Sequence, residues 1–213
     1  MEYCERLGND FWAEPVNALT NAGFVIAAIL LFRLLRQQQA KTTPWDIYVL
    51  VFLLACVGIG SFLWHTFAAP WAALADKLPI FAFMFLYLFS YMARVLQMPW
   101  FWSLSCLGMF IFLNVVVKQW LPADLLNGSI MYLPALFALL LLGLVSIYRR
   151  LPGAKIMLGV TGLFCVSVLF RSVDQLVCES FPLGTHFVWH LLNALMLYWL
   201  MTVLSQSTQI AKY

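Results

Sequence analysis

Long apolar runs separated by short polar segments make up most of the sequence. The runs lie near residues 19–36, 47–67, 79–98, 100–117, 130–148, 156–171 and 186–204. Each has roughly the 20 residues that an α-helix needs to cross a hydrocarbon core about 30 Å thick. The two-residue alternation of barrel strands is absent. The pattern therefore predicts an all-α, polytopic membrane protein with seven transmembrane helices.

The polar segments between the runs contain proline, glycine and charged residues, which end helices. None of them suggests a separate soluble unit, so we expect residues 1–213 to form a single membrane domain, with residues 1–18 as an acidic outer segment. This segment lacks the basic stretch of a cleavable signal peptide, so we expect the first helix to stay in the mature protein. The composition agrees with this class, because 10% of residues are charged against about 25% in soluble domains.

Lysines and arginines are distributed unequally between the two ends of the predicted helices. Eight lie at one end: Arg33, Arg36, Lys41, Arg94, Arg149, Arg150, Lys155 and Lys212. Four lie at the other end: Arg6, Lys77, Lys118 and Arg171. Because positive charge gathers on the cytoplasmic side, the C-terminus is predicted in the cytoplasm and the N-terminus outside. These flanking residues explain the net charge of +3, so we expect no nucleic-acid partner and no obligate protein partner.

The chain has three histidines, His65, His186 and His190, and all lie near ends of predicted helices. His186 and His190 are four residues apart, which places both imidazoles on one face of the seventh helix. His65 closes the second helix at the same, outer end. Three neutral imidazoles with one position left for water form a known type of catalytic zinc site. Since ionisable residues in membrane helices are costly unless paired or metal-bound, the pattern predicts a metal centre or three hydrogen-bonded core residues.

Two further polar residues lie close to His65 in the sequence. Ser61 is four residues earlier on the same helix face, where its hydroxyl bonds either the carbonyl of residue 57 or a group near the metal. Asp76 is placed just before Pro79, in the segment expected to link the second and third helices. It is interpreted either as a solvated residue at a helix start or as a carboxylate that accepts a proton from bound water or orients a histidine.

Acidic residues are concentrated near the N-terminus. Four of the nine in the chain lie in its first fourteen positions: Glu2, Glu5, Asp10 and Glu14. Carboxylates on a short loop suit calcium and, less well, magnesium, although an acidic segment kept outside by topology has the same composition. Cys4 in this segment and Cys178 before the seventh helix both lie on the outer side, where an oxidising compartment permits a bridge.

These residues lie in segments that resemble the alkaline ceramidases, which belong to a wider superfamily of seven-helix, zinc-dependent membrane hydrolases of lipid amides. The matching segments are EYCE at 2–5, WAEPVNALTN at 12–21, GSFLWH at 60–65, LADKLP at 74–79, DQLVCES at 174–180 and GTHFVWHLLN at 184–193. They span nearly the whole chain in the family's order. The resemblance implies hydrolysis of the amide bond of ceramide or a related N-acyl lipid, giving a sphingoid base or another amine and a free fatty acid.

The resemblance also implies roles for individual residues. The zinc ligands correspond to His65, His186 and His190, a serine beside the metal to Ser61, and the active-site aspartate to Asp76. Ligands of a structural calcium ion correspond to Glu2, the carbonyl of Tyr3, Glu5 and Glu14, with a last position that falls among residues 7–10, such as Asn9 or Asp10. A family disulfide corresponds to Cys4 and Cys178.

The chain also departs from the family pattern. Glu2 stands in place of an aspartate, Tyr3 in place of a tryptophan, and Lys77 where an acidic residue is common. The short loops resemble those of bacterial members, which implies a bacterial inner membrane with the active site toward the periplasm. Two alternatives use the same histidines. One is a metal-binding receptor or sensor of the progestin and adiponectin receptor type with little or no hydrolysis, and the other is a haem b protein with axial histidines.

Overall fold

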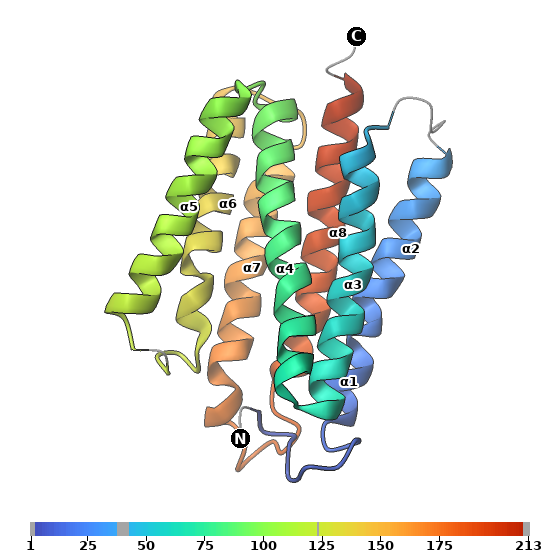
Figure 1. Cartoon of the computed structure of the whole chain (residues 1–213), viewed down its shortest axis with the longest axis vertical. Coiled ribbons are helices and arrows are strands. Elements are labelled where there is room, and N and C mark those ends of the chain that lie inside the picture. Colours follow the sequence, from blue (N-terminus) through green and yellow to red (C-terminus); the bar gives the residue numbers. More distant parts are fainter. Residues whose placement is uncertain (1–2, 38–42, 123, 211–213) are drawn as a thin grey trace.

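The computed structural model describes residues 3–37, 43–122 and 124–210, with side chains up to residue 207. The helices run side by side along the long axis of the molecule (Figure 1). They are α1 (Pro15–Thr20), α2 (Ala22–Gln37), α3 (Trp45–Phe67), α4 (Pro70–Ser90), α5 (Trp100–Trp120), α6 (Leu133–Tyr148), α7 (Ala154–Val173) and α8 (His186–Ile210). Three short elements join them: the π-helical turn η2 (Tyr91–Val95) and the 3-10 turns η3 (Ser129–Tyr132) and η4 (Asp174–Leu176).

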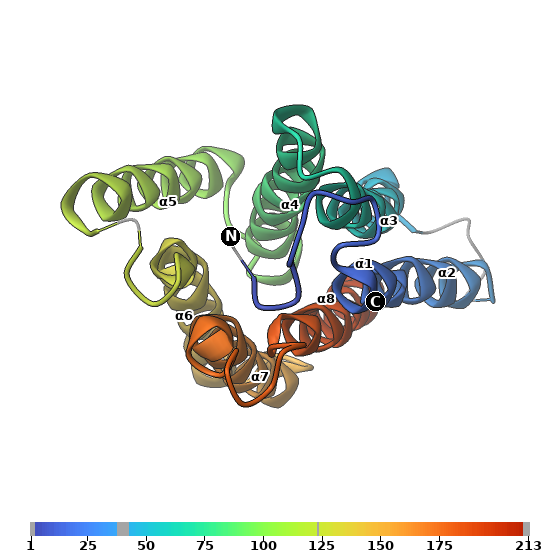
Figure 2. The same cartoon turned by 90° about the horizontal axis from the view of Figure 1, so that it is seen from below.

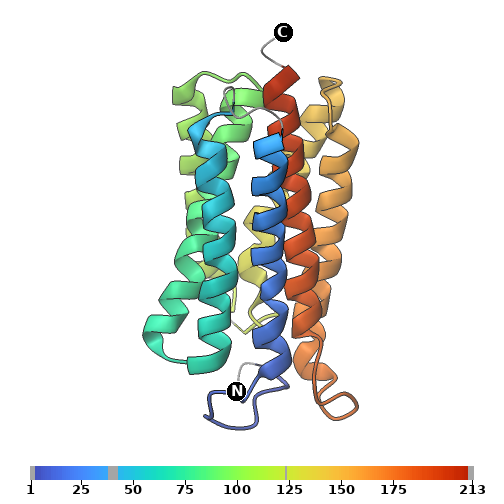
Figure 3. The same ribbon diagram turned by 90° about the vertical axis from the view of Figure 1, so that its right-hand side faces the viewer.

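Seven segments of the described chain are long and apolar enough to cross a membrane, which confirms the predicted all-α, multi-pass architecture. Helices α1 and α2 together form the first of them, Pro15–Gln37. The N-terminal segment, residues 3–14, lies at the opposite end of the bundle from the last turns of α8 (Figures 1 and 3). Which end faces the cytoplasm stays a prediction, and Lys41 and Lys212, on which it partly depends, lie outside the described residues.

The third transmembrane helix differs from the predicted span 79–98. It begins at Pro70, because proline fits the first turn of a helix, where its missing N–H is not needed. Pro79 lies inside α4 instead of preceding it. The helix continues through η2 and ends before Gln97, whose φ of 52° is left-handed. Asp76 therefore lies within a helix and not in a linking segment.

Helices α3 and α4 approach each other very closely beside Pro79. A Cβ atom on Gly60 of α3 would collide with the carbonyl oxygen of Ala75 and would lie 2.7 Å from its carbonyl carbon. That carbonyl is the group whose helical donor Pro79 lacks. Because Gly60 has no side chain, its neighbour Ser61 lies against the turn of α4 that carries Asp76.

The most buried helices are the ones that carry the histidines. In the membrane spans of both α3 and α8, 44% of the apolar stretch is buried inside the bundle, compared with 11% in the span of α5. Seen from the N-terminal end, residues 3–14 cross the mouth of the bundle close to α4 and α8 (Figure 2). The site described below therefore lies between two central helices and beneath the N-terminal segment.

The close approach at Gly60 can be tested by adding a methyl group. We expect Gly60→Ala to destabilise the protein by about 1–3 kcal/mol, because the added Cβ meets main-chain atoms that cannot move independently. Gly108→Ala is the matched control, since a Cβ at that position on α5 meets nothing within 4 Å. Thermal unfolding in detergent should show a lower Tm for Gly60→Ala alone. Equal Tm values for the two variants would contradict the packing described here.

Candidate metal centre

The three histidines meet at the end of the bundle that residues 3–14 cover. His65 lies in the last turn of α3, and His186 and His190 lie in the first two turns of α8. Their ring centroids are 4.5–5.2 Å apart. One ligand nitrogen from each ring lies within 4.8 Å of the others, and each residue is at most 2% exposed. The prediction that the three histidines lie at the same depth in the bundle is thus confirmed. The three rings are close enough to hold one ion.

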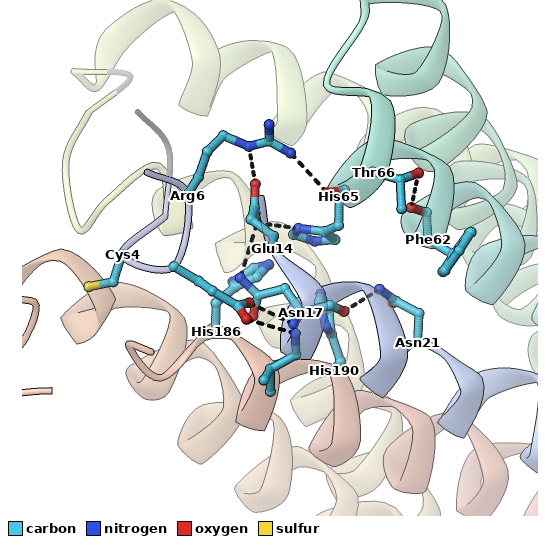
Figure 4. Close-up of polar contacts among 12 residues, drawn as sticks. Cys4, Arg6, Glu14, Asn17, Asn21, Phe62, His65, Thr66, His186 and His190 are labelled. Atoms are coloured by element: carbon cyan, nitrogen blue, oxygen red, sulfur yellow. Dashed lines mark hydrogen bonds and ion pairs between the residues drawn. The ribbon is translucent and has the colours of Figure 1, made fainter. Parts of the chain in front are cut away.

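Glu14 determines which nitrogen of His65 carries the proton. The Oε2 atom of Glu14 lies 2.6 Å from Nδ1 of His65 and accepts a second hydrogen bond, of 3.0 Å, from Nδ2 of Asn17 (Figure 4). Burial raises the pKa of the Glu14 carboxyl, but the hydrogen bonds from His65, Arg6 and Asn17 outweigh it and hold the pKa below its ordinary value. An ionised carboxylate only accepts, so Nδ1 of His65 donates to it and Nε2 is the nitrogen left for a ligand.

Thr20 determines in the same way which nitrogen of His190 carries the proton. Its Oγ1 atom lies 3.0 Å from Nδ1 of His190 and also 2.8 Å from the carbonyl oxygen of Val16 and 3.0 Å from that of Asn17. The hydroxyl has one hydrogen, which it donates to these carbonyls, so it accepts from Nδ1–H of the imidazole. Nε2 of His190 is therefore left with a lone pair for a ligand.

His186 has a buried ring nitrogen without a partner. Its Nδ1 atom makes no hydrogen bond within the described chain, and its ring stacks on Tyr3 with the centroids 3.8 Å apart. A buried polar atom left unpaired is costly, and a metal bound at this nitrogen would remove that cost. Three imidazoles, two of them with an oriented second nitrogen, are donors that suit zinc. The residues present therefore fit that ion.

The start of α8 is held by a buried carboxylate. Asp174 accepts hydrogen bonds from the backbone N–H groups of Thr185 (2.6 Å) and His186 (2.9 Å), which begin the helix. Its other oxygen accepts the N–H of Cys4 at 3.1 Å. Cys4 forms the disulfide with Cys178, which confirms the pairing implied by the resemblance. One carboxylate thus links the N-terminal segment, the disulfide and the helix that presents two histidines.

A small cavity joins the histidines to the other predicted site residues. Its volume is about 40 Å³, which is room for an ion and a water molecule. Ser61, Asp76 and Arg171 line it together with the three imidazoles. The Ser61 hydroxyl and the Asp76 carboxylate lie close to each other at this cavity. The site therefore combines candidate metal ligands, a carboxylate, a hydroxyl and a positive charge around one small cavity.

The residues expected to bind calcium have other partners. Glu2 lies outside the described residues, and Asn9 and Asp10 are exposed. Both carboxylate oxygens of Glu5 accept backbone N–H groups at the start of α1, from Val16 (2.7 Å) and Asn17 (2.8 Å).

The two remaining predicted ligands, Tyr3 and Glu14, both bond to Arg6. The Tyr3 carbonyl accepts the N–H of Arg6, and Glu14 is ion-paired with the Arg6 guanidinium. A divalent cation about 4 Å from a guanidinium is repelled by about 8 kcal/mol at an effective dielectric constant of about 20. The described residues therefore do not fit a calcium ion.

Comparison with known proteins identifies the family. The family model described as "Ceramidase" matches residues 1–212. The chain belongs to the ceramidase family. Ceramidases hydrolyse lipid amides and depend on a metal, so this ceramidase-family protein is a membrane hydrolase with a lipid substrate. A comparison with curated proteins finds no match.

Four residues that support the site were not predicted from the sequence. Thr20 and Asp174 lie inside the segments that resemble the family but carried no assigned role. In the sequence, Arg6 and Arg171 are recognised only as basic residues at the outer ends of the predicted helices. Arg171 did carry a signal, because it ends a predicted transmembrane span, and its guanidinium lies 5.6 Å from the ring centroid of Tyr132 at the cavity wall.

Removing the Asp174 carboxylate should destabilise the start of α8. We expect Asp174→Ala to cost about 2–4 kcal/mol, because buried N–H groups lose their acceptor. Glu179→Ala, an exposed acidic residue of the same loop, is the control and should be neutral. Thermal unfolding of both variants in detergent measures the difference. A wild-type Tm for Asp174→Ala would contradict this role.

Proposed function

We propose that this protein hydrolyses the amide bond of ceramide or a related N-acyl lipid at a zinc ion held by His65, His186 and His190. The observation that carries the proposal is the set of three buried imidazoles, two of which have Nδ1 occupied so that Nε2 is left for a ligand. Membership of the ceramidase family supports the reaction class. The products are a sphingoid base, or another amine, and a free fatty acid.

The side chains around the cavity have complementary roles in this reaction. When bound, zinc lowers the pKa of water to about 7 and polarises a carbonyl oxygen. Asp76 accepts a proton from the attacking water, whose oxygen joins the acyl carbon, and delivers that proton to the nitrogen as the C–N bond breaks. Ser61 donates a hydrogen bond to the oxyanion, a contribution that reaches about 3–4 kcal/mol in other hydrolases.

A second cavity supports a substrate with an acyl chain. It lies among helices α4 to α8, and its lining surface is apolar. Phe83, Phe110, Leu139 and Met196 are among the residues that line it. Met196 is six residues beyond His190 on α8, which is about 9 Å along the helix axis. A carbonyl group at the histidines would therefore leave its chain pointing into apolar surroundings at bilayer depth.

The position of the disulfide supports the predicted compartment. The bridge between Cys4 and Cys178 lies at the same end of the bundle as the histidines. Disulfides persist in oxidising compartments such as the bacterial periplasm. We place the active site toward the periplasmic side of an inner membrane on this basis and on the distribution of basic residues.

Removal of a metal ligand tests the proposed centre. We expect His190→Ala to lose both stoichiometric zinc and the release of fatty acid from ceramide, because two imidazoles bind zinc far more weakly than three. Leu191→Ala, a change at the exposed neighbouring position, should keep both. Elemental analysis and chromatography of released fatty acid measure the two properties. Hydrolysis at the wild-type rate by zinc-free His190→Ala would refute the proposal.

The two polar residues should affect turnover and not metal content. We expect Ser61→Ala to lower kcat roughly 100-fold, through loss of one donor to the oxyanion, and Asp76→Asn to lower it by about 100- to 10,000-fold, through loss of proton transfer. Zinc content should stay at the wild-type level in both variants. Wild-type turnover by Asp76→Asn would remove this residue from proton transfer.

A further inference from the structure

Arg6 lies at the centre of the polar contacts behind the histidines. Its guanidinium donates to the Glu14 carboxylate through Nε and to the His65 carbonyl through Nη2 at 2.8 Å (Figure 4). It also donates to the Gly8 carbonyl through Nη1 at 3.3 Å. Only 9% of the residue is exposed. A cation that is this buried is held by its partners and is not a solvated surface charge.

The oxygens around Arg6 are of the kind that calcium binds. A carboxylate and main-chain carbonyls are ordinary calcium ligands, and Glu14 is one of the residues expected to supply them. Glu14 is 2% exposed, and a buried carboxylate needs a partner of opposite charge. Within the described chain, Arg6 is the permanently charged residue that contacts it. The positive charge that a calcium ion would bring is thus already supplied by a side chain.

We propose that Arg6 takes the place of calcium in this protein and positions the metal centre. The guanidinium holds Glu14 against Nδ1 of His65 and, through the His65 carbonyl, ties the last turn of α3 to the N-terminal segment. The centre is therefore assembled without a calcium ion. This inference rests on the proposed zinc centre, because the residue acts on a metal ligand through Glu14.

The shape of the side chain explains why an arginine stands here. The contacts come from three different nitrogens of one planar group, and they point to oxygens on residues 8, 14 and 65. An ammonium group is a compact point charge without this fixed fork. We therefore expect Arg6→Lys to preserve the charge but only part of the positioning.

The wild-type protein provides the first test. Purified protein transferred to calcium-free buffer should contain stoichiometric zinc and no stoichiometric calcium. Millimolar calcium chloride should change neither its amide hydrolysis nor its rate of zinc loss to a coloured chelator. Stoichiometric calcium, or hydrolysis that requires added calcium, would overturn the inference and leave the zinc centre intact. Absence of zinc would instead refute the proposed function.

Variants provide the second test, with zinc loss to the chelator as the measurement. We expect Arg6→Ala and Glu14→Gln to weaken zinc retention about 10- to 100-fold, the range typical of residues that orient a metal ligand, and Arg6→Lys to fall between Arg6→Ala and wild type. Lys118→Ala removes an exposed cation at the end of α5 and should behave as wild type. Wild-type zinc retention by Arg6→Ala would contradict the positioning role. Should Arg6→Ala fail to fold, Glu14→Gln and the wild-type calcium content still decide the matter.

Discussion

A buried imidazole offers a metal its Nε2 lone pair only when its Nδ1 atom holds the proton, and an acceptor must keep that proton in place. Glu14 is the acceptor for His65, at 2.6 Å, and Thr20 is the acceptor for His190. Both acceptors belong to the short stretch at the start of the first span. The rest of the site depends on this arrangement, because it fixes the orientation of two rings from different helices before any ligand binds.

Two features of the backbone bring the remaining groups to the histidines. Pro79 leaves the carbonyl of Ala75 without its helical donor, and Gly60 lets α3 pack directly on that carbonyl. Ser61 and Asp76 are neighbours of these residues in sequence and so meet at the cavity. At the other side, Asp174 caps the start of α8 and holds Cys4. The end of the bundle that holds the histidines is thus fixed by short polar contacts within an otherwise apolar bundle.

The sequence was informative where a pattern is local and less so where a contact is distant. The spacing of His186 and His190 and the matching depth of His65 predicted the cluster, because helical periodicity and span length determine both. Asp76 was placed in a linking segment, since Pro79 was interpreted as a helix start although Pro70 has that role. Arg6 contacts the carbonyl of a residue 59 positions away. No spacing rule predicts such a contact. From the sequence, Arg6 is therefore recognised only as a basic residue at the outer end of the predicted helices.

In the proposed metal centre, His65, His186 and His190 share one zinc ion. X-ray absorption at the zinc edge of the purified protein tests it most directly, because the method counts and identifies the nearest atoms. We expect three imidazole nitrogens and one oxygen at about 2.0–2.2 Å from zinc. A shell that contains sulfur, or fewer than two imidazoles, would contradict it.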